Sequence, residues 1–104
     1  MRVVTLNVNG IRSAARKGLY RWLAAQKADV ICLQETKARE ADLEGGPFVI
    51  KGFERRLHSA EKKGYSGVAL YSRRKPQAVV KGFGVEEFDG EGRFLEANFG
   101  KLSV

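Results

Sequence analysis

The chain has 104 residues, which is enough for one small domain with a modest core. Its 19 basic residues outnumber 12 acidic ones, and the formal net charge of +7 favours a polyanionic partner, with nucleic acid before a membrane surface. The ordinary apolar content excludes a disordered chain, and no apolar run is long enough to cross a membrane. The single cysteine, Cys32, lies in an apolar run, so we expect a buried thiol in a reducing compartment.

The first 35 residues predict a strand, a helix and a second strand. The first strand, Val3–Leu6, is rich in β-forming residues, and the second, Val30–Leu33, is an unbroken apolar run that is typical of a strand covered on both faces. The segment between them is long enough for a helical crossover, so the two strands should be parallel. Asn7 and Glu35 each follow a strand, and we therefore expect them to be neighbours at one edge of the sheet.

The connecting segment predicts one helix, Ser13–Gln26. Its apolar stripe has helical spacing and includes Trp22, which we expect in the core rather than as a platform for a ligand. Ser13 can cap the helix, although an alternative is that the regular helix begins at Gly18. The basic residues near the helix form either a solvated face or a phosphate-contacting face: Arg12, Arg16, Lys17 and Arg21.

A carboxylate and a carboxamide that lie together at such an edge can bind a metal ion. Both groups supply oxygen ligands, and Mg²⁺ binds few protein ligands and keeps several of its waters. Asn7 and Glu35 are therefore candidates for a magnesium site. The spacing equally allows Glu35 to be a solvated strand end and Asn7 a turn residue.

The rest of the chain predicts a short helical turn and then several strands. The turn covers 39–43, a Gly-Gly-Pro break follows at 45–47, and the strands are expected at 53–58, 66–72, 78–85, 95–99 and 102–104. His58 is the only histidine, and we expect a structural role for it rather than metal binding. Hairpins at this end would leave one sheet edge and one sheet face uncovered, which indicates the first part of a larger domain.

Four motifs occur in a recognisable order. They are Asn7-Val8-Asn9-Gly10-Ile11-Arg12, Leu33-Gln34-Glu35-Thr36-Lys37, the strand that begins Gly64-Tyr65-Ser66-Gly67-Val68, and Asp89-Gly90-Glu91-Gly92-Arg93. Together they resemble the exonuclease III branch of AP endonucleases, within the endonuclease/exonuclease/phosphatase superfamily. The resemblance runs from Val3 to the last residue. It implies an α/β fold in which residues 1–104 form the N-terminal part of a two-sheet α/β sandwich, with the C-terminal portion of that single domain absent.

The resemblance also implies roles for individual residues. Glu35 matches the metal-binding glutamate of the family, and Asn7 matches the asparagine that orients the site beside the metal. Asn9 stands where some relatives have an aspartate near the metal. The other matched positions imply contacts with the DNA backbone: Asn9, Arg12, Lys37, Gly64 and Tyr65.

The implied chemistry is hydrolysis of a phosphodiester with Mg²⁺, or Mn²⁺ in its place. The implied substrate is double-stranded DNA with an abasic or 3′-blocked site, cut on the 5′ side of the abasic nucleotide, with 3′ to 5′ exonuclease or 3′ phosphodiesterase activity alongside. An abasic nucleotide has no base to unstack, so its extrusion costs less than that of a normal nucleotide. We expect a cytoplasmic protein of the bacterial, nucleoid-associated type, because no targeting signal precedes the first strand.

The later catalytic residues of the family are missing from these 104 residues. The tyrosine of the next strand, the Asp-x-Asn pair and the closing Ser-Asp-His have no match here, so we expect the chain alone to be inactive or nearly so. An alternative is a non-catalytic nucleic-acid-binding or assembly module that reuses half of the fold. Full-length relatives are expected to be monomers, and the sequence does not fix the oligomeric state of this chain.

Overall fold

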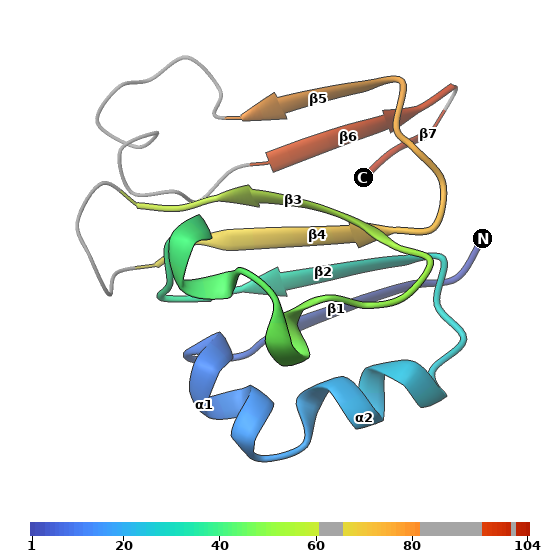
Figure 1. Ribbon diagram of the computed structural model, residues 1–104. Helices are drawn as coiled ribbons and strands as arrows, with labels where there is room; N and C mark the ends of the chain where they lie inside the picture. Colours follow the sequence, from blue (N-terminus) through green and yellow to red (C-terminus); the bar gives the residue numbers. More distant parts are fainter. Residues whose placement is uncertain (61–65, 82–94, 101) are drawn as a thin grey trace.

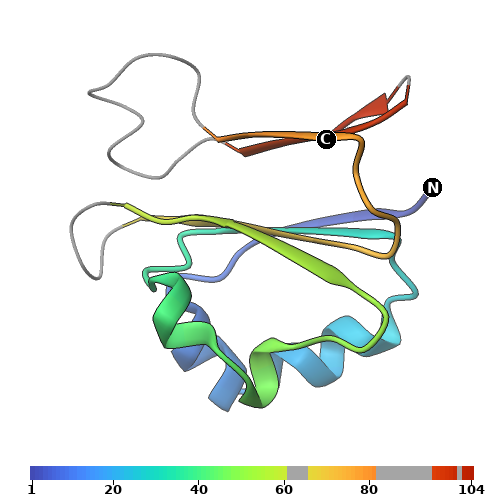
Figure 2. The ribbon, with the colours of Figure 1, turned by 45° about the horizontal axis from the view of Figure 1, so that its top comes forward.

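The computed structural model describes residues 1–60, 66–81, 95–100 and 102–104. Two sheets lie face to face, and two α-helices cover the outer face of the larger sheet (Figures 1 and 2). In chain order the elements are β1 (Val3–Asn7), α1 (Ile11–Arg16), α2 (Leu19–Ala25), β2 (Val30–Gln34), the 3₁₀ turns η1 (Glu40–Leu43) and η2 (Gly46–Phe48), β3 (Glu54–His58), β4 (Val68–Ser72), β5 (Ala78–Lys81), β6 (Leu95–Phe99) and β7 (Leu102–Ser103).

The larger sheet has four strands in the order β1-β2-β4-β3. Strands β1 and β2 are parallel, as their helical connection predicted, and Val3 pairs with Val30 while Asn7 pairs with Gln34. Strand β4 is antiparallel to both β2 and β3, so β1, β2 and β3 all point toward the same edge. The carboxyl ends of β1 and β2 therefore lie side by side, on the left in Figure 1.

The predicted helix Ser13–Gln26 is two short helices. Gly18 has a φ of +99° and separates α1 from α2, because a left-handed residue ends the regular hydrogen-bonding pattern. The second helix thus begins after Gly18, as the alternative start anticipated, while a continuous helix capped by Ser13 was wrong. Leu19 and Leu23 face the core, but Trp22 is 47% exposed, so its predicted core position was also wrong.

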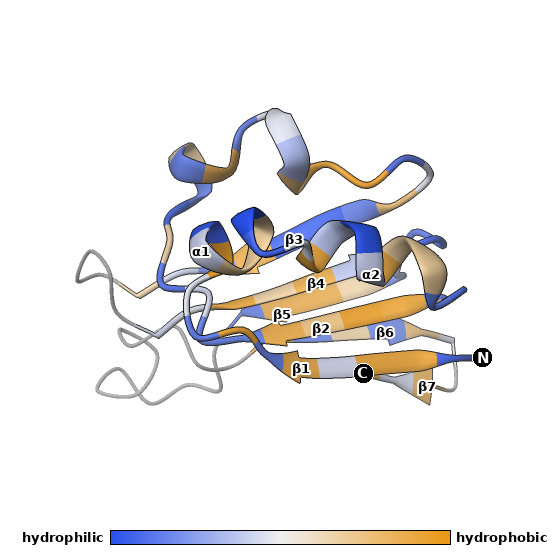
Figure 3. Cartoon of the chain, turned by 90° about the horizontal axis from the view of Figure 1, so that it is seen from below, coloured by the Kyte–Doolittle hydropathy of each residue, from blue (hydrophilic) through white to orange (hydrophobic). Residues whose placement is uncertain are grey.

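Two apolar cores lie on the two faces of the larger sheet. The helices pack on one face, where Ile31 and Leu33 of β2 are buried, and the smaller sheet packs on the other face against Val30. Strand β2 is therefore covered on both sides, as its unbroken apolar run predicted. Figure 3 shows β2 and β4 coloured as mostly hydrophobic, whereas the helices carry both colours.

The smaller sheet has the order β5-β6-β7, with both pairs antiparallel. The strand expected at 78–85 is present as β5 over Ala78–Lys81, and the residues that follow Lys81 lie outside the described part of the chain. Cys32 is half-buried rather than buried, and its partial burial raises the pKa of the thiol. No helix in the described residues is long and apolar enough to span a membrane.

Candidate metal and phosphate site

Asn7 and Glu35 meet at the edge where β1 and β2 end. The Asn7 side-chain amide Nδ2 donates a hydrogen bond to Oε2 of the Glu35 carboxylate. The two residues are 28 positions apart in the chain, and the parallel pairing of their strands brings them together. Their expected proximity is therefore confirmed, while their roles remain predictions.

Backbone hydrogen bonds continue past the strand ends and fix the two loops to one another. The Val8 N–H donates to the Gln34 carbonyl at 2.9 Å, the Gly10 N–H to the Glu35 carbonyl at 2.8 Å, and the Ile11 N–H to the Thr36 carbonyl at 2.9 Å. Three of the four residues 8–11 therefore donate to residues 34–36, so the segments 7–11 and 34–37 are held together as one ledge rather than as two independent loops.

The ledge carries a chain of hydrogen bonds that runs from a carboxylate to an ammonium group. Asn7 binds Glu35 through its Nδ2 and accepts the Asn9 backbone N–H on its Oδ1 at 3.0 Å. The Asn9 carboxamide Oδ1 in turn accepts a hydrogen bond from Nζ of Lys37 at 2.6 Å. Four of the sequence-predicted residues, Asn7, Asn9, Glu35 and Lys37, are thus one connected cluster.

Three residues of the cluster have left-handed backbone conformations that non-glycine residues rarely adopt. The φ angles are +44° for Asn9, +52° for Glu35 and +53° for Lys37. Such residues cost free energy that the surrounding contacts must offset, and they concentrate at functional sites. Lys27 and Ser66 are the other non-glycine residues with a positive φ in the described part of the chain, so three of these five belong to the cluster.

Arg12 joins the cluster from the first turn of α1. Its Nη2 donates to the Lys37 carbonyl at 3.5 Å, at the limit of a hydrogen bond. A hollow of about 430 Å³ opens beside this contact, and its lining is polar and basic: Gly10, Arg12, Ser13, Arg16 and Lys37. An anion is the complementary ligand for a hollow with three cationic side chains.

The residues present fit a weakly held magnesium ion. The ligand that is available is the Glu35 carboxylate, to which only Asn7 donates a hydrogen bond in the described part of the chain. The Asn7 Oδ1 accepts the Asn9 N–H, so in this arrangement Asn7 orients the carboxylate and does not offer its oxygen to an ion. Mg²⁺ is commonly bound through one or two carboxylates and keeps several waters. The described residues contain no cluster of three or more His, Cys, Asp or Glu side chains, so this is not a closed cage for a metal.

Two of the predicted DNA-binding residues, Gly64 and Tyr65, lie outside the described residues. The strand that follows them does reach the ledge. The Gly67 carbonyl accepts the Thr36 N–H at 3.1 Å, and the Ser66 carbonyl accepts the Lys37 N–H at 2.6 Å. The start of β4 therefore supports the segment that carries Glu35 and Lys37.

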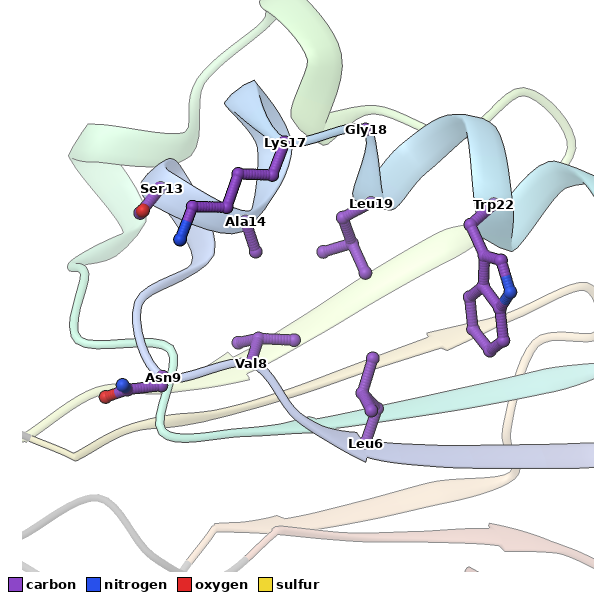
Figure 4. A pocket seen from close by; sticks show the side chains of 9 residues that line it. All are labelled: Leu6, Val8, Asn9, Ser13, Ala14, Lys17, Gly18, Leu19 and Trp22. Carbon is purple, nitrogen blue, oxygen red and sulfur yellow. The ribbon is translucent and has the colours of Figure 1, made fainter.

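Sequence reasoning missed two features next to the site. The first is the contact of Gly67 with Thr36, whose fully buried hydroxyl has no hydrogen-bond partner among the described residues. A glycine directly before the apolar strand β4 was the available signal. The second is a groove of about 410 Å³ between the edge strand β1 and the helices, where Leu6 and Leu19 point toward one another and Trp22 stands at the outer end (Figure 4).

The sequence pattern of the endonuclease/exonuclease/phosphatase family matches residues 4–104. The chain belongs to this family. It is 39% identical over 105 residues to an exodeoxyribonuclease of Bacillus subtilis, and the match covers all of this chain and 40% of the relative. It is 38% identical over 104 residues to the DNA repair nuclease APEX1 of Danio rerio, covering 95% of this chain and 33% of the relative.

Solved structures of the family have the same fold. An AP endonuclease from Archaeoglobus fulgidus aligns with a TM-score of 0.77 at 33% identity, over 93% of this chain and 37% of that structure. The resemblance read from the sequence motifs and the predicted two-sheet α/β fold are both confirmed. The chain spans about two fifths or less of the length of these relatives.

Proposed function

We propose that this chain supplies the N-terminal, metal- and phosphate-binding part of a DNA-repair nuclease of the exonuclease III type. The reaction is hydrolysis of a phosphodiester on the 5′ side of an abasic site in duplex DNA, with 3′ to 5′ exonuclease or 3′ phosphodiesterase activity alongside. The observation that carries the proposal is the contact of Asn7 with Glu35 at the edge shared by β1 and β2. The names of the relatives, an exodeoxyribonuclease and a DNA repair nuclease, support the substrate class.

Each residue of the cluster has a defined task in this proposal. Glu35 would hold Mg²⁺, or Mn²⁺, beside Asn7, whose Oδ1 accepts the Asn9 N–H in this structure. A bound divalent ion would supply charge stabilisation of the phosphate oxygens and the leaving oxygen. Asn7 orients the Glu35 carboxylate through its Nδ2. Lys37 and Arg12 attract and position the phosphate backbone, and positioning together with charge stabilisation accounts for most of the catalysis of phosphoryl transfer.

The remaining predicted residues contribute to DNA binding. We assign Gly64 and Tyr65 to contacts with the DNA backbone, on the motif match alone. Asn9 contributes to DNA binding through its hydrogen bond with Lys37. The net charge of +7 suits a duplex partner, and such binding should weaken steeply with salt. A DNA substrate is also what supports the expected nucleoid-associated, cytoplasmic setting.

The decisive test is a chimera in which residues 1–104 replace the matched N-terminal part of the Bacillus subtilis exodeoxyribonuclease. We expect Mg²⁺-dependent incision of a duplex with one abasic site, which EDTA abolishes. Glu35→Ala should lower the rate of incision by about 100-fold or more. The control is Glu44→Ala, which removes an exposed glutamate directly after η1 and should leave the rate within about twofold. A folded chimera that cuts equally well with and without Glu35 would refute the proposal.

The alternative is a nucleic-acid-binding or assembly module without catalysis, and the absence of a three-ligand metal cluster among the described residues is the observation that favours it. Measurements on the 104-residue chain alone distinguish duplex binding from catalysis. We expect salt-sensitive duplex binding with little or no incision from the chain alone. An inactive chimera that still binds duplex as tightly as the relative would favour the alternative.

A further inference from the structure

We propose that Asn9 is a positioning residue that fixes the Lys37 ammonium group beside the basic hollow, where it can bind a phosphate oxygen. The proposal rests on the proposed function for the identity of its ligand, a phosphodiester. Its physical basis is the 2.6 Å hydrogen bond from Lys37 Nζ to Asn9 Oδ1. A lysine side chain is flexible, so its charge contributes to a site only where a partner restricts it.

The Lys37 backbone is already fixed without Asn9. Its N–H donates to the Ser66 carbonyl at 2.6 Å, and its carbonyl accepts the Arg12 guanidinium. Only the position of the ammonium group therefore depends on the Asn9 side chain. A change at residue 9 should alter where this charge lies without altering where the chain runs.

Asn9 is itself held in place by its backbone. Its N–H donates to the Asn7 Oδ1 at 3.0 Å, and its backbone is left-handed, with a φ of +44°. An asparagine tolerates this conformation better than most residues do, because its short polar side chain bonds locally to the backbone. The same turn thus orients Asn7 toward Glu35 and Asn9 toward Lys37.

The neutrality of Asn9 matters as much as its position. A carboxylate in the same place would form an ion pair with Lys37 and cancel the charge that a phosphate needs. A carboxamide oxygen accepts the same hydrogen bond and leaves the charge uncompensated. Together with Arg12 and Arg16, Lys37 then gives the hollow three cationic groups near the single carboxylate of Glu35.

The substitution that tests this is Asn9→Gly, since glycine accepts a positive φ without strain and removes the side chain that binds Lys37. We compare it with Lys37→Met, with the double variant, and with Lys51→Met as a control at the opposite edge, next to the start of β3. Asn9→Asp keeps the hydrogen bond and adds a charge. Thermal unfolding confirms that each variant is folded.

The first readout is binding of the full chain to a fluorescent duplex carrying a tetrahydrofuran abasic analogue, in EDTA, between about 50 and 200 mM KCl. Asn9→Gly should weaken binding about fivefold when Lys37 is present and less than about twofold in the Lys37→Met background. Asn9→Asp should weaken it about tenfold and lower the salt slope by about one, as Lys37→Met does. Lys51→Met should keep the affinity within about twofold.

The second readout is titration of the ¹⁵N-labelled chain with inorganic phosphate, followed at the Lys37 amide. If phosphate binds in an Asn9-dependent way but the duplex does not bind, the positioning role stands and the proposed nucleic-acid function fails. If Asn9→Gly changes neither affinity, or weakens binding equally with and without Lys37, the positioning role is overturned while duplex binding continues to support the proposed function. Absence of binding to both probes overturns both.

Discussion

Gly67 supports the site from the start of β4, and its replacement by alanine offers a sharp test of how the ledge is packed. A Cβ at this position would lie 2.4 Å from the Thr36 hydroxyl oxygen, closer than real Cβ atoms approach other atoms. Thr36 is completely buried between the two candidate site residues Glu35 and Lys37, so it has little space in which to retreat. Gly67 also has a φ of +92°, which strains any residue with a Cβ.

The two effects can be separated. Left-handed strain costs about 1 kcal/mol, and overpacking of a filled site costs about 1–3 kcal/mol more, so Gly67→Ala should destabilise the fold by about 2–4 kcal/mol. Gly45→Ala is the matched control, because Gly45 has a φ of +69° and nothing within 4 Å of its added Cβ. It should cost about 1 kcal/mol, from strain alone. The difference between the two variants measures the contact with Thr36.

Urea unfolding followed by circular dichroism measures both values. Making Gly67→Ala in a Thr36→Ala chain measures the effect of the Thr36 hydroxyl. Without that hydroxyl, the nearest neighbours of the new Cβ are 3.6 and 3.7 Å away, which is ordinary van der Waals contact. Gly67→Ala should then cost no more than Gly45→Ala does. The packing argument would be refuted by equal costs for Gly67→Ala and Gly45→Ala in the unaltered chain.

Two other predictions concern the core beneath the helices. Burial raises the pKa of Tyr20 and of Tyr71, whose hydroxyls share a 2.8 Å hydrogen bond. Above the ordinary tyrosine pKa of about 10, the tyrosines of the unfolded chain lose their protons while those of the folded chain keep them. The free energy of unfolding should therefore fall as pH rises above about 10, and Tyr20→Phe should make that slope shallower in urea titrations; an unchanged slope would contradict the assignment. Leu23→Ala should cost about 2–4 kcal/mol and Trp22→Ala about 1 kcal/mol, since Leu23 is 3% exposed and Trp22 47%; the reverse order in thermal unfolding would contradict the observed burial.

The sequence predicted the architecture well where apolar patterns and chain connectivity leave one solution. The unbroken run Val30–Leu33 indicated a strand covered on both faces, and a helical crossover required β1 and β2 to be parallel. These two facts alone bring Asn7 and Glu35 to the same edge. The proximity of the two residues is thus a consequence of topology, which is why it could be predicted without a structure.

The errors occurred where local geometry competes with periodicity. Helical spacing placed Trp22 on the same stripe as Leu23, but Trp22 lines the groove beside the edge strand β1 and is 47% exposed, whereas Leu19 and Leu23 are buried. The break at Gly18 was likewise not expected as the end of a separate first helix. The position of β4 between β2 and β3 was also absent from the prediction, since strand order in a mixed sheet is set by packing. Periodicity describes one regular element at a time and carries no information about such breaks.

The left-handed conformations at Glu35 and Lys37 could not have been read from the sequence, because glutamate and lysine have no preference for them, whereas asparagine, as at Asn9, does. Each strained residue is held by a hydrogen bond to another segment. The Gly10 N–H binds the Glu35 carbonyl, the Ser66 carbonyl binds the Lys37 N–H, and the Asn7 side chain binds the Asn9 N–H. The strain therefore persists only while β1, β2 and the start of β4 are assembled together. The relative orientation of the carboxylate and the ammonium group is consequently a property of the folded sheet edge, and neither loop would reproduce it as an isolated peptide.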